Sequence, residues 1–383
     1  MPTERKRSLS QTGGPCELWG EPEEAQRLAG CLDVDPGAKL PFTHGFHAYP
    51  ARMHPETARR AVDAFPGRRV LDPFVGSGTV AVEAVRAGRG FTGVDISRVG
   101  LEIAWARTRV MHPDRCRQVE AAAHRLADRA FGEVDRDFEW PAWTREERAW
   151  YDPHTLREVA VLKALIDGEA EEWIRRILAV VLSSIVVKLS KQISDSDAKV
   201  DAYHRPKPRG ATFRWFRDRS SELTKGLLQL SSDLHKRKVP FVEPELRLDD
   251  ARTVALPAGG FDLVLTSPPY AGTYDYAFHH ARRFPLFGED PSFARAREIG
   301  SRRKPENYPE DLSAALRKAI RALAPGGKAL ILIGEGDQLL KELAPSLEAR
   351  VVAMASQLRR DWKGGPARRE SLALLTSAGR SPH

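Results

Sequence analysis

The chain has 383 residues, and its 60 lysines and arginines exceed its 52 acidic residues, which gives a formal net charge of +8. Apolar residues make up 42% and charged residues 29%, a composition typical of soluble globular proteins. It excludes a disordered tail protein, a collagen-like chain and a disulfide scaffold. The length predicts two or three domains, or one large domain with an insertion, and the positive excess fits a partner rich in phosphate.

Cysteine spacing and hydropathy indicate the compartment. The three cysteines, Cys16, Cys31 and Cys116, form no Cys-x-x-Cys pair, so we expect neither a metal site nor a disulfide framework. The N-terminus is polar and lacks the apolar core of a secretory signal. The most apolar run, residues 177–189, is too short to cross a bilayer. We therefore expect a cytoplasmic protein with no metal and no membrane contact.

The first part of the chain changes character near Arg69. Residues 1–40 are polar and contain the chain breakers Gly13-Gly14-Pro15, so we expect a mostly irregular arm. Residues 69–72 predict a short strand, which a glycine loop and a helix to about residue 87 follow. A second strand over 90–95 and a helix to about residue 111 repeat this order. Such alternation indicates a parallel sheet with right-handed crossovers.

A helical stretch then interrupts this pattern. Helices are predicted over 153–166, 170–192 and about 213–236, and the second is apolar nearly all round, as the buried centre of a subdomain would be. Strands and helices alternate again after residue 240. The later elements are a strand over 261–266, a helix over about 309–323 and strands over 328–333, 350–355 and 371–376. The expected architecture is one α/β domain with a helical insertion.

The first chemical motif is Val70-Leu-Asp-Pro-Phe-Val-Gly-Ser-Gly-Thr-Val80. Gly76 and Gly78 follow a strand and open a helix, where glycines let the backbone approach a ligand and free N–H groups face it. Asp95 ends the next strand, the position from which an acidic residue binds ribose hydroxyls in dinucleotide folds. A tight strand–helix turn without a ligand is the alternative interpretation.

The second motif is Thr266-Ser-Pro-Pro-Tyr270, directly after an apolar strand. Its two prolines cannot continue a central strand, and they fix the backbone while removing N–H donors. The turn therefore offers a rigid group of acceptors, which suits a bound amino group, and Tyr270 adds a flat face for a planar ring. The alternative is a plain turn that ends a strand.

Together, Asp72-Pro-Phe-Val-Gly-Ser-Gly-Thr79 and Ser267-Pro-Pro-Tyr270 resemble the motifs of the S-adenosylmethionine-dependent DNA amino-methyltransferases. The resemblance implies a Rossmann-like class I methyltransferase domain, an α/β fold with a mostly parallel seven-stranded sheet, and S-adenosylmethionine as cofactor. In that family Ser-Pro-Pro-Tyr tends toward N4 of cytosine, whereas Asp- or Asn-Pro-Pro tends toward N6 of adenine.

The resemblance also implies roles for individual residues. Asp72 would bind the methionine amino group, Asp95 the ribose, and Asp250 in the turn Asp249-Asp-Ala-Arg252 the adenine. The segment His47-Ala-Tyr-Pro-Ala-Arg52 would lie near the methionine end of the cofactor. The implied cofactor-binding set is Tyr49, Ala51, Asp72, Phe74, Gly76, Ser77, Gly78, Thr79, Asp95 and Asp250, and the implied catalytic set is Ser267, Pro268, Pro269 and Tyr270.

The expected organisation has four parts. They are a polar arm over 1–40, the cofactor-binding part over 41–112, the helical insertion over 113–240 and the catalytic part over 241–383. The resemblance covers about 41–112 and 241–383. The insertion is either a target-recognition region or a structural lid or dimer surface.

Basic clusters are candidate nucleic-acid contacts. Residues 203–219 mix cations with the aromatic residues Phe213, Trp215 and Phe216, a combination that suits phosphate contact and base stacking. Two further clusters lie near residues 295–304 and 359–369. A solvated surface is the alternative for each cluster. The candidate contacts are Arg205, Lys207, Arg209, Arg214, Arg217, Arg302 and Arg303, together with Tyr274 and Tyr276 beside the catalytic turn.

The predicted function is methyl transfer from S-adenosylmethionine to the exocyclic amino group of a DNA base, with N4 of cytosine favoured. The alternatives are N6-adenine methylation, amino-methylation of a base in RNA, and an inactive binding module of the same fold. Methylation of cytosine carbon-5 would need a thiolate, and Cys16 lies in the arm, away from both motifs. DNA is the expected partner, with a cognate restriction endonuclease as a further one.

Overall fold

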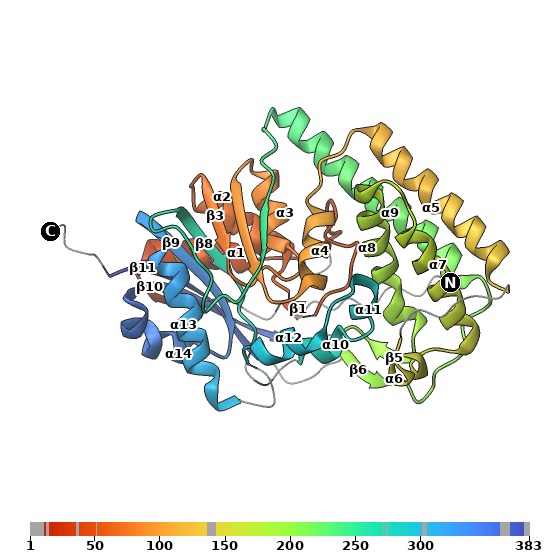
Figure 1. Ribbon diagram of the computed structural model, residues 1–383. Helices are drawn as coiled ribbons and strands as arrows, with labels where there is room; N and C mark the ends of the chain where they lie inside the picture. Colours follow the sequence, from red (N-terminus) through yellow and green to blue (C-terminus); the bar gives the residue numbers. More distant parts are fainter. Residues whose placement is uncertain are drawn as a thin grey trace.

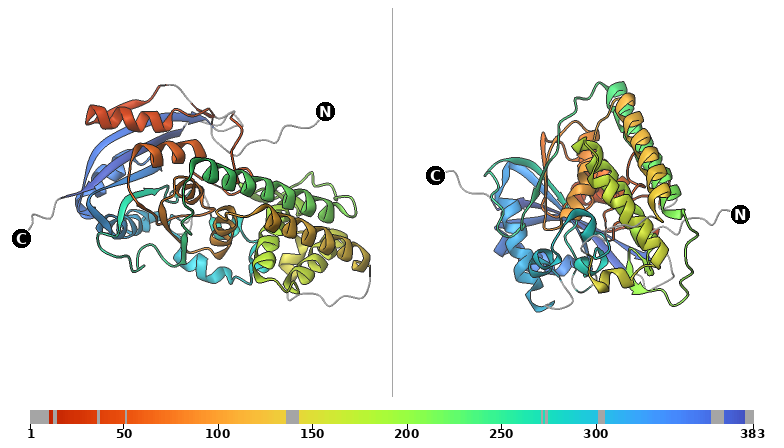
Figure 2. Two further views of the ribbon diagram at one scale, coloured as in Figure 1. Left: turned by 90° about the horizontal axis from the view of Figure 1, so that it is seen from above. Right: turned by 45° about the vertical axis from the view of Figure 1, so that its right-hand side comes forward.

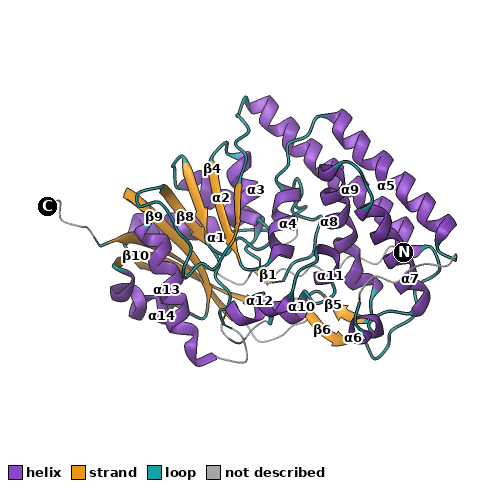
Figure 3. Ribbon diagram, viewed as in Figure 1, coloured by secondary structure: helices purple, strands orange, loops and turns teal. Residues whose placement is uncertain are grey.

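The computed structural model describes residues 11–12, 15–35, 38–50, 52–135, 143–270, 272, 275–300, 305–360 and 368–378. A twisted sheet with helices on both faces lies beside a group of long helices (Figure 1, Figure 3). None of the helices in the described part of the chain is both long and apolar enough to span a membrane.

Seven strands form the centre of the sheet, in the spatial order β10-β11-β9-β8-β3-β4-β7. Their bounds are β3 Arg69–Asp72, β4 Gly90–Asp95, β7 Glu245–Leu248, β8 Phe261–Thr266, β9 Leu323–Gly334, β10 Ala349–Arg360 and β11 Arg368–Ser377. The neighbours from β9 to β7 pair in parallel, and β11 runs antiparallel to both of its neighbours. The mostly parallel seven-stranded sheet that the resemblance implies is confirmed.

The prediction of an irregular N-terminal arm is wrong for its described residues. The short strands β1 (Gln11–Thr12) and β2 (Glu17–Gly20) pair with β10, and helix α1 (Pro22–Leu32) packs against the sheet. The sequence does not reveal these two strands, because chain-breaking residues separate them and each strand is very short. Strands this short are stable only when they add their hydrogen bonds to the edge of an existing sheet. The arm thus extends the sheet to nine strands.

Helices cover both faces of the sheet (Figure 2). One face packs on α1, α2 (Pro55–Ala64) and α3 (Thr79–Arg86), and the other on α13 (Tyr308–Arg321) and α14 (Asp337–Leu343). Strand β8 is therefore buried on both sides, since Leu263 and Leu265 point to one core and Val264 to the other. Burial on both sides explains the unbroken apolar run of this strand.

The insertion contains the three predicted helices, with ends within three residues of the prediction. Its elements are α5 (Pro113–Glu133), α6 (Arg145–Ala149), α7 (Pro153–Asp167), α8 (Glu172–Leu189), α9 (Ala211–Arg237) and the hairpin β5 (Gln192–Ser194) to β6 (Asp197–Val200). Helix α8 buries 12 of its 18 residues, so it is the buried centre that its apolar sequence predicts. Helix α5 and the hairpin were not predicted.

A run of short elements connects the sheet to the insertion. These are α10 (Tyr276–His279), α11 (Phe284–Phe287), α12 (Pro291–Arg297) and η1 (Pro305–Asn307), all between β8 and α13. Phe284 of α11 shares one hydrophobic core with α8 and with Val99 of α4 (Arg98–Arg107). The insertion therefore packs directly on the cofactor-binding and catalytic parts. The predicted boundaries between the parts stay predictions.

Candidate active site

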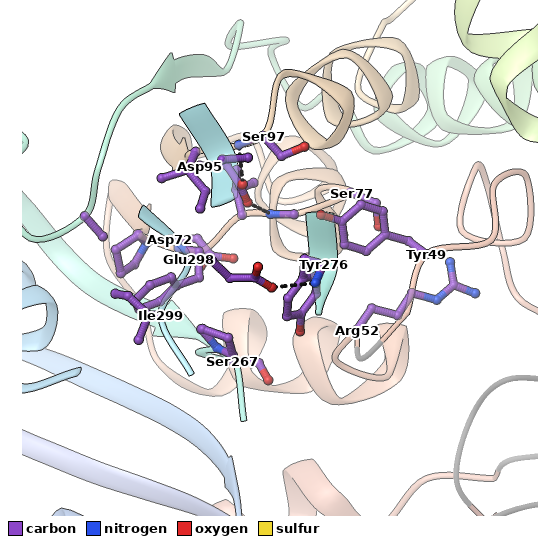
Figure 4. Close-up of a pocket in the computed structure, with 18 of the residues that line it drawn as sticks. Tyr49, Arg52, Asp72, Ser77, Asp95, Ser97, Ser267, Tyr276, Glu298 and Ile299 are labelled. Carbon is purple, nitrogen blue, oxygen red and sulfur yellow. Dashed lines mark hydrogen bonds between the residues drawn. The ribbon is translucent and has the colours of Figure 1, made fainter. Parts of the chain in front are cut away.

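A pocket opens where the carboxyl ends of β3, β4 and β8 meet (Figure 4). Parallel strands end at the same edge of a sheet, and ligands of such folds bind in the crevice there. Both chemical motifs reach this pocket. Of the predicted cofactor-binding residues, those that line it are Tyr49, Asp72, Phe74, Gly76, Ser77, Thr79, Asp95 and Asp250.

The glycine loop depends on backbone conformations that favour glycine. Gly76 has φ 48° and Gly78 has φ 78°, and Gly78 caps the N-terminus of α3. A Cβ on Gly78 would lie 2.7 Å from the Cβ of Ala104, so a side chain there would collide with α4. Gly78 does not line the pocket. Its role in the structure is to permit the tight turn that leads into α3.

Asp95 holds the glycine loop in place. Its Oδ2 accepts a hydrogen bond of 2.8 Å from Gly76 N, and its Oδ1 accepts one of 2.9 Å from Ser97 N. Asp95 thus fixes the loop and faces the pocket at the same time (Figure 4). The loss of this carboxylate would disturb the loop as well as any bound ribose.

Asp72 links the two motifs. Its Oδ1 accepts hydrogen bonds from Thr266 Oγ1 at 2.6 Å and from Phe74 N at 3.1 Å. The residue is only 3% exposed. The end of β3 is therefore joined to the end of β8 by a buried contact, immediately before the Ser-Pro-Pro-Tyr turn.

The carboxylates of the pocket favour a cationic ligand. Burial raises the pKa of Asp72 to about 7, against which the Thr266 and Phe74 hydrogen bonds work only in part. Burial likewise raises the pKa of Asp95 to about 6, despite its hydrogen bonds to Ser97 and Gly76. Among the described residues, no cation contributes to either shift. Two neighbouring carboxylates without a basic partner would be stabilised by a positively charged ligand.

His280 is a pocket residue that lies outside both sequence motifs. Its ring lies 4.6 Å from that of Tyr49, and burial holds its pKa well below the usual range. Arg283 Nη1 lies 3.4 Å from Nδ1, so the proton of the neutral ring is on Nε2. This Nε2 and the hydroxyl of Thr79 are buried without a hydrogen-bond partner within the described chain. Both groups line the pocket and can serve a ligand.

Asp250 lines the pocket, but its carboxylate faces Arg252. Arg252 Nη2 lies 2.6 Å from Oδ2, and Arg252 also reaches Asp311 at 2.7 Å. Burial acts to raise the pKa of Asp250, but the hydrogen bonds from Arg252 outweigh it and hold the pKa below its usual value. A contact with adenine would therefore share this carboxylate with Arg252.

The residues of the Ser-Pro-Pro-Tyr turn face two sides, the pocket and strand β9. Ser267 and Pro269 line the pocket, and Tyr308 Oη donates a hydrogen bond of 3.0 Å to the Pro269 carbonyl. The Tyr270 ring instead packs against Gly334 of β9, where a Cβ would lie 2.9 Å from the ring. Pro268 is buried. The turn is thus held from behind while Ser267 faces the pocket (Figure 4).

The structure does not bring all the predicted nucleic-acid contacts to one place. Tyr276 lines the pocket, and its N–H donates to Glu298 Oε1 at 2.5 Å (Figure 4). The cluster over 203–219 lies in the insertion, where Arg205, Arg209 and Arg214 are exposed and Lys207 is half-buried. Ala51, Tyr274, Arg302 and Arg303 lie outside the described residues.

Three details of these clusters differ from the prediction. Phe213 and Phe216 are 2% and 0% exposed and belong to the insertion's core, so they cannot stack on a base. Arg217 forms an ion pair with Asp128. In the third cluster, Arg359 pairs with Glu370 and Arg369 with Glu17. Packing and internal ion pairs therefore account for several residues that the sequence assigned to nucleic acid.

Comparison with known proteins agrees with the motifs. Residues 17–105 match the family described as DNA methylase, which takes in N6 and N4 methyltransferases. The Type II methyltransferase M.MvaI of Kocuria varians is 21% identical over 246 residues, which cover 60% of this chain and 53% of the relative. Over these residues the chain is similar to the DNA amino-methyltransferases. It spans about half the length of the curated relative that it matches.

Two solved structures are similar over most of the chain. TrmN of Thermus thermophilus is 16% identical, covers 84% of this chain and 48% of its own, and has a TM-score of 0.32. An S-adenosylmethionine-dependent methyltransferase of Methanosarcina mazei is 9% identical, covers 83% and 98%, and has a TM-score of 0.33. Neither similarity gives information on the fold beyond the sheet described above.

S-adenosylmethionine is the cofactor of the family, and the residues of the pocket fit it. Its ammonium and sulfonium groups are cationic, and the pocket contains two carboxylates that lack a basic partner among the described residues. Its hydroxyl and carboxylate groups can pair with the side chains of Thr79 and His280, whose buried polar atoms have no partner in the described chain. Asp72 and Asp95 are the residues that would hold its charged and ribose groups.

Replacement of Asp72 by Asn tests this electrostatic account. The folded-state pKa of Asp72, about 7, lies above the ordinary value of 3.8. The folded protein therefore binds more protons than the unfolded chain between about pH 4 and 7, and the stability contributed by this group falls as the pH rises through that range. In Asp72→Asn the amide oxygen can still accept from Thr266 and Phe74. We expect this variant to be more stable than wild type at pH 8, yet to bind S-adenosylmethionine about 10- to 100-fold more weakly.

Urea unfolding at pH 5 and pH 8 measures the first effect, and calorimetry measures the second. Asp262→Asn is a matched control, since Asp262 caps the N–H groups of Arg68 and Arg69 at the opposite end of the strands. This control should lose stability and keep cofactor affinity. An Asp72→Asn variant that is less stable than wild type at pH 8, or that keeps full affinity, would contradict the account.

Proposed function

We propose that this protein transfers a methyl group from S-adenosylmethionine to the exocyclic amino group of a base in DNA, at N4 of cytosine. The observation that carries the proposal is the position of Ser267 on the wall of the same pocket as Asp72 and Asp95. The Asp72–Thr266 hydrogen bond supports it further, because it joins the cofactor side of this pocket to the catalytic turn.

The chemistry of an aromatic amine explains the residues of the turn. S-adenosylmethionine, when bound, supplies an electrophilic methyl group on a sulfonium. An exocyclic amino group is a poor nucleophile, because its lone pair is delocalised into the ring. Ser267 Oγ and the Pro268 carbonyl can each accept one amino hydrogen, which favours a pyramidal nitrogen with its lone pair directed into the pocket. Orientation and fixed hydrogen-bond acceptors therefore supply the catalysis, and no covalent enzyme intermediate is needed.

The choice of cytosine depends on the first residue of the motif. Ser267 stands where family members that favour adenine have Asp or Asn, and a neutral hydroxyl suffices because the methylated nitrogen loses its proton easily. A base inside a duplex cannot reach a recessed pocket, so the target base would flip out or come from a single strand. DNA is the proposed partner, together with a cognate restriction endonuclease. N6-adenine and RNA products are the competing outcomes.

Ser267→Ala tests the catalytic role. The substitution removes one acceptor for the amine and leaves the glycine loop unchanged. The loss of one oriented hydrogen bond that strengthens in the transition state typically lowers the rate about 100-fold or more. We therefore expect turnover to fall by about this factor in an assay of methyl transfer from labelled cofactor to DNA. Calorimetry on the same variant should give the wild-type affinity for S-adenosylmethionine.

A Ser267→Ala enzyme with full activity would contradict the assignment. An equal loss of cofactor affinity and turnover would also count against it, since the role would then be structural. RNA of the same sequence, assayed in parallel with the labelled cofactor, distinguishes DNA from RNA as the substrate.

The exposed cations of the insertion can be tested through salt dependence. Arg205 and Arg214 are exposed, whereas Arg217 is already paired with Asp128. If the first two contact phosphates, the double variant Arg205→Ala/Arg214→Ala should weaken binding to all DNA sequences alike. The slope of log affinity against log salt should fall by about one for each lost contact.

Fluorescence anisotropy over a range of salt concentrations measures this slope. Arg217→Ala is the control, and its slope should change less because its charge is already neutralised within the protein. An unchanged slope in the double variant would assign this surface a structural role.

A further inference from the structure

Arg283 is a fully buried cation that lies behind the pocket. Its guanidinium forms an ion pair with Asp195. Its Nε donates a hydrogen bond of 3.2 Å to the Ser183 carbonyl, and its Nη1 donates one of 3.4 Å to Nδ1 of His280. Arg283 itself does not line the pocket, whereas His280 does. An effect of Arg283 on a ligand would therefore pass through His280.

The helical insertion holds this arginine in place. Ser183 belongs to α8, and Asp195 lies in the turn between β5 and β6. The hydroxyl of Ser183 is also hydrogen-bonded to His47 Nε2 at 2.9 Å. His47 precedes the pocket residue Tyr49 by two positions. The insertion thus contacts both Arg283 and the segment that leads into the pocket wall.

His280 presents a single proton donor to the pocket. An arginine can only donate, so Nδ1 of His280 accepts and the proton of the neutral ring is on Nε2. Nε2 is buried and has no hydrogen-bond partner within the described chain. Burial holds the pKa of this ring well below its usual range, so the donor carries no charge. A buried donor of this kind needs an acceptor, which a ligand of the pocket can supply.

The ring of Tyr49 places His280 on the cofactor side of the pocket. The two rings lie 4.6 Å apart, and a Cβ on Gly76 would lie 3.1 Å from Cε1 of Tyr49. His280 is therefore separated from the glycine loop by one aromatic ring. Asp95 is the candidate for the ribose and Asp250 for the adenine. The remaining strong acceptor of S-adenosylmethionine is the carboxylate of its methionine part.

We propose that Arg283 is a positioning residue that holds His280 as the hydrogen-bond donor for the methionine carboxylate of the cofactor. This inference rests on the proposed function, which takes S-adenosylmethionine as the ligand. A neutral donor suits this position, because a further cation in the pocket would repel the sulfonium and ammonium groups of the cofactor. The insertion then supports the cofactor site through Arg283.

Two substitutions of His280 separate its donor from its contact with Arg283. In His280→Asn the side-chain oxygen can replace Nδ1 as the acceptor for Arg283, but the donor at Nε2 is lost. In His280→Gln the longer side chain can place its amide nitrogen where Nε2 was. We expect His280→Asn to bind S-adenosylmethionine about 10- to 100-fold more weakly, and His280→Gln to stay within about threefold of wild type.

Decarboxylated S-adenosylmethionine is the matched ligand for calorimetry, because it keeps the sulfonium, ribose and adenine. Without the carboxylate, the donor of His280 has nothing to gain. Both variants should therefore bind this analogue within about twofold of the wild-type affinity. A merely structural role of His280 would weaken both ligands alike.

Arg283→Lys tests the positioning role. The single ammonium of lysine cannot reach all the partners of the guanidinium, so the proton of His280 is no longer confined to Nε2. We expect affinity for S-adenosylmethionine to fall about 3- to 10-fold, with no change for the analogue. The double variant Arg283→Lys/His280→Asn should bind S-adenosylmethionine as weakly as His280→Asn alone, since Arg283 acts only through His280.

Nitrogen NMR of the protein labelled at histidine reads the position of the proton directly. The signal of His280 is assigned by its absence from the spectrum of His280→Asn. The wild-type ring should have the Nε2–H form, and its Nε2 signal should move when S-adenosylmethionine is added but much less with the analogue. In Arg283→Lys the Nδ1–H form should appear as well.

Several results would overturn the proposal. They are wild-type affinity for S-adenosylmethionine in His280→Asn, equal losses for the two ligands, additive losses in the double variant, and an Nδ1–H ring in the wild type. Unchanged affinities with lost turnover on DNA would also overturn it, since His280 would then contact the target base. A protein that binds S-adenosylmethionine and methylates no DNA would contradict the proposed function alone, because these affinities are measured without DNA.

Discussion

The buried hydrogen bond between Thr266 and Asp72 is the contact on which the rest of the site depends. Strands β3 and β8 pair only through Val70 with Leu263 and Leu71 with Val264, and the ladder stops before their carboxyl ends. The pocket opens where this ladder stops. The side-chain bond then sets how far apart the two ends lie, and with them the glycine loop and the Ser-Pro-Pro-Tyr turn.

This arrangement has an energetic cost in the protein without ligand. Two carboxylates lie in a recess with raised pKa values of about 7 and about 6, and no cation among the described residues compensates them. Such carboxylates lower the stability of the ligand-free protein and favour binding of a cationic ligand. Binding pockets commonly reduce the stability of a protein in this way. The same principle applies to the hydroxyl of Thr79 and Nε2 of His280, which are buried and have no hydrogen-bond partner in the part of the chain that the structure describes.

The sequence predicts those parts of the site that lie in continuous motifs. The glycine loop, Asp95 and the Ser-Pro-Pro-Tyr turn could be found because each stands at the end of a recognisable apolar strand. The hydrogen bond from Tyr270 to Glu370 behind the turn could not be found in this way, since the two residues lie 100 positions apart and meet only through the order of β11 and β9 in the sheet. His280 likewise reaches the pocket from an irregular segment whose sequence has no periodic pattern.

Two errors of the sequence analysis have a physical cause. The aromatic residues near Arg214 suggested base stacking, but Phe213 and Phe216 belong to the buried side of α9, which continues through Leu223 and Leu227. Helical spacing was therefore a better guide than composition. The arm appeared irregular because β2 and α1 gain their stability from the edge strand β10, a contact that lies more than 300 residues away in the sequence.

The identity of the modified nucleoside tests the central claim most directly. DNA from cells that express the protein would be digested to nucleosides and analysed by mass spectrometry, with DNA from cells that express Ser267→Ala as the reference. The account predicts N4-methylcytosine in the first sample and little or none in the second. N6-methyladenine would move the specificity to the other branch of the family. Methyl on cytosine carbon-5 would contradict the mechanism, because no thiol lines the pocket among the described residues.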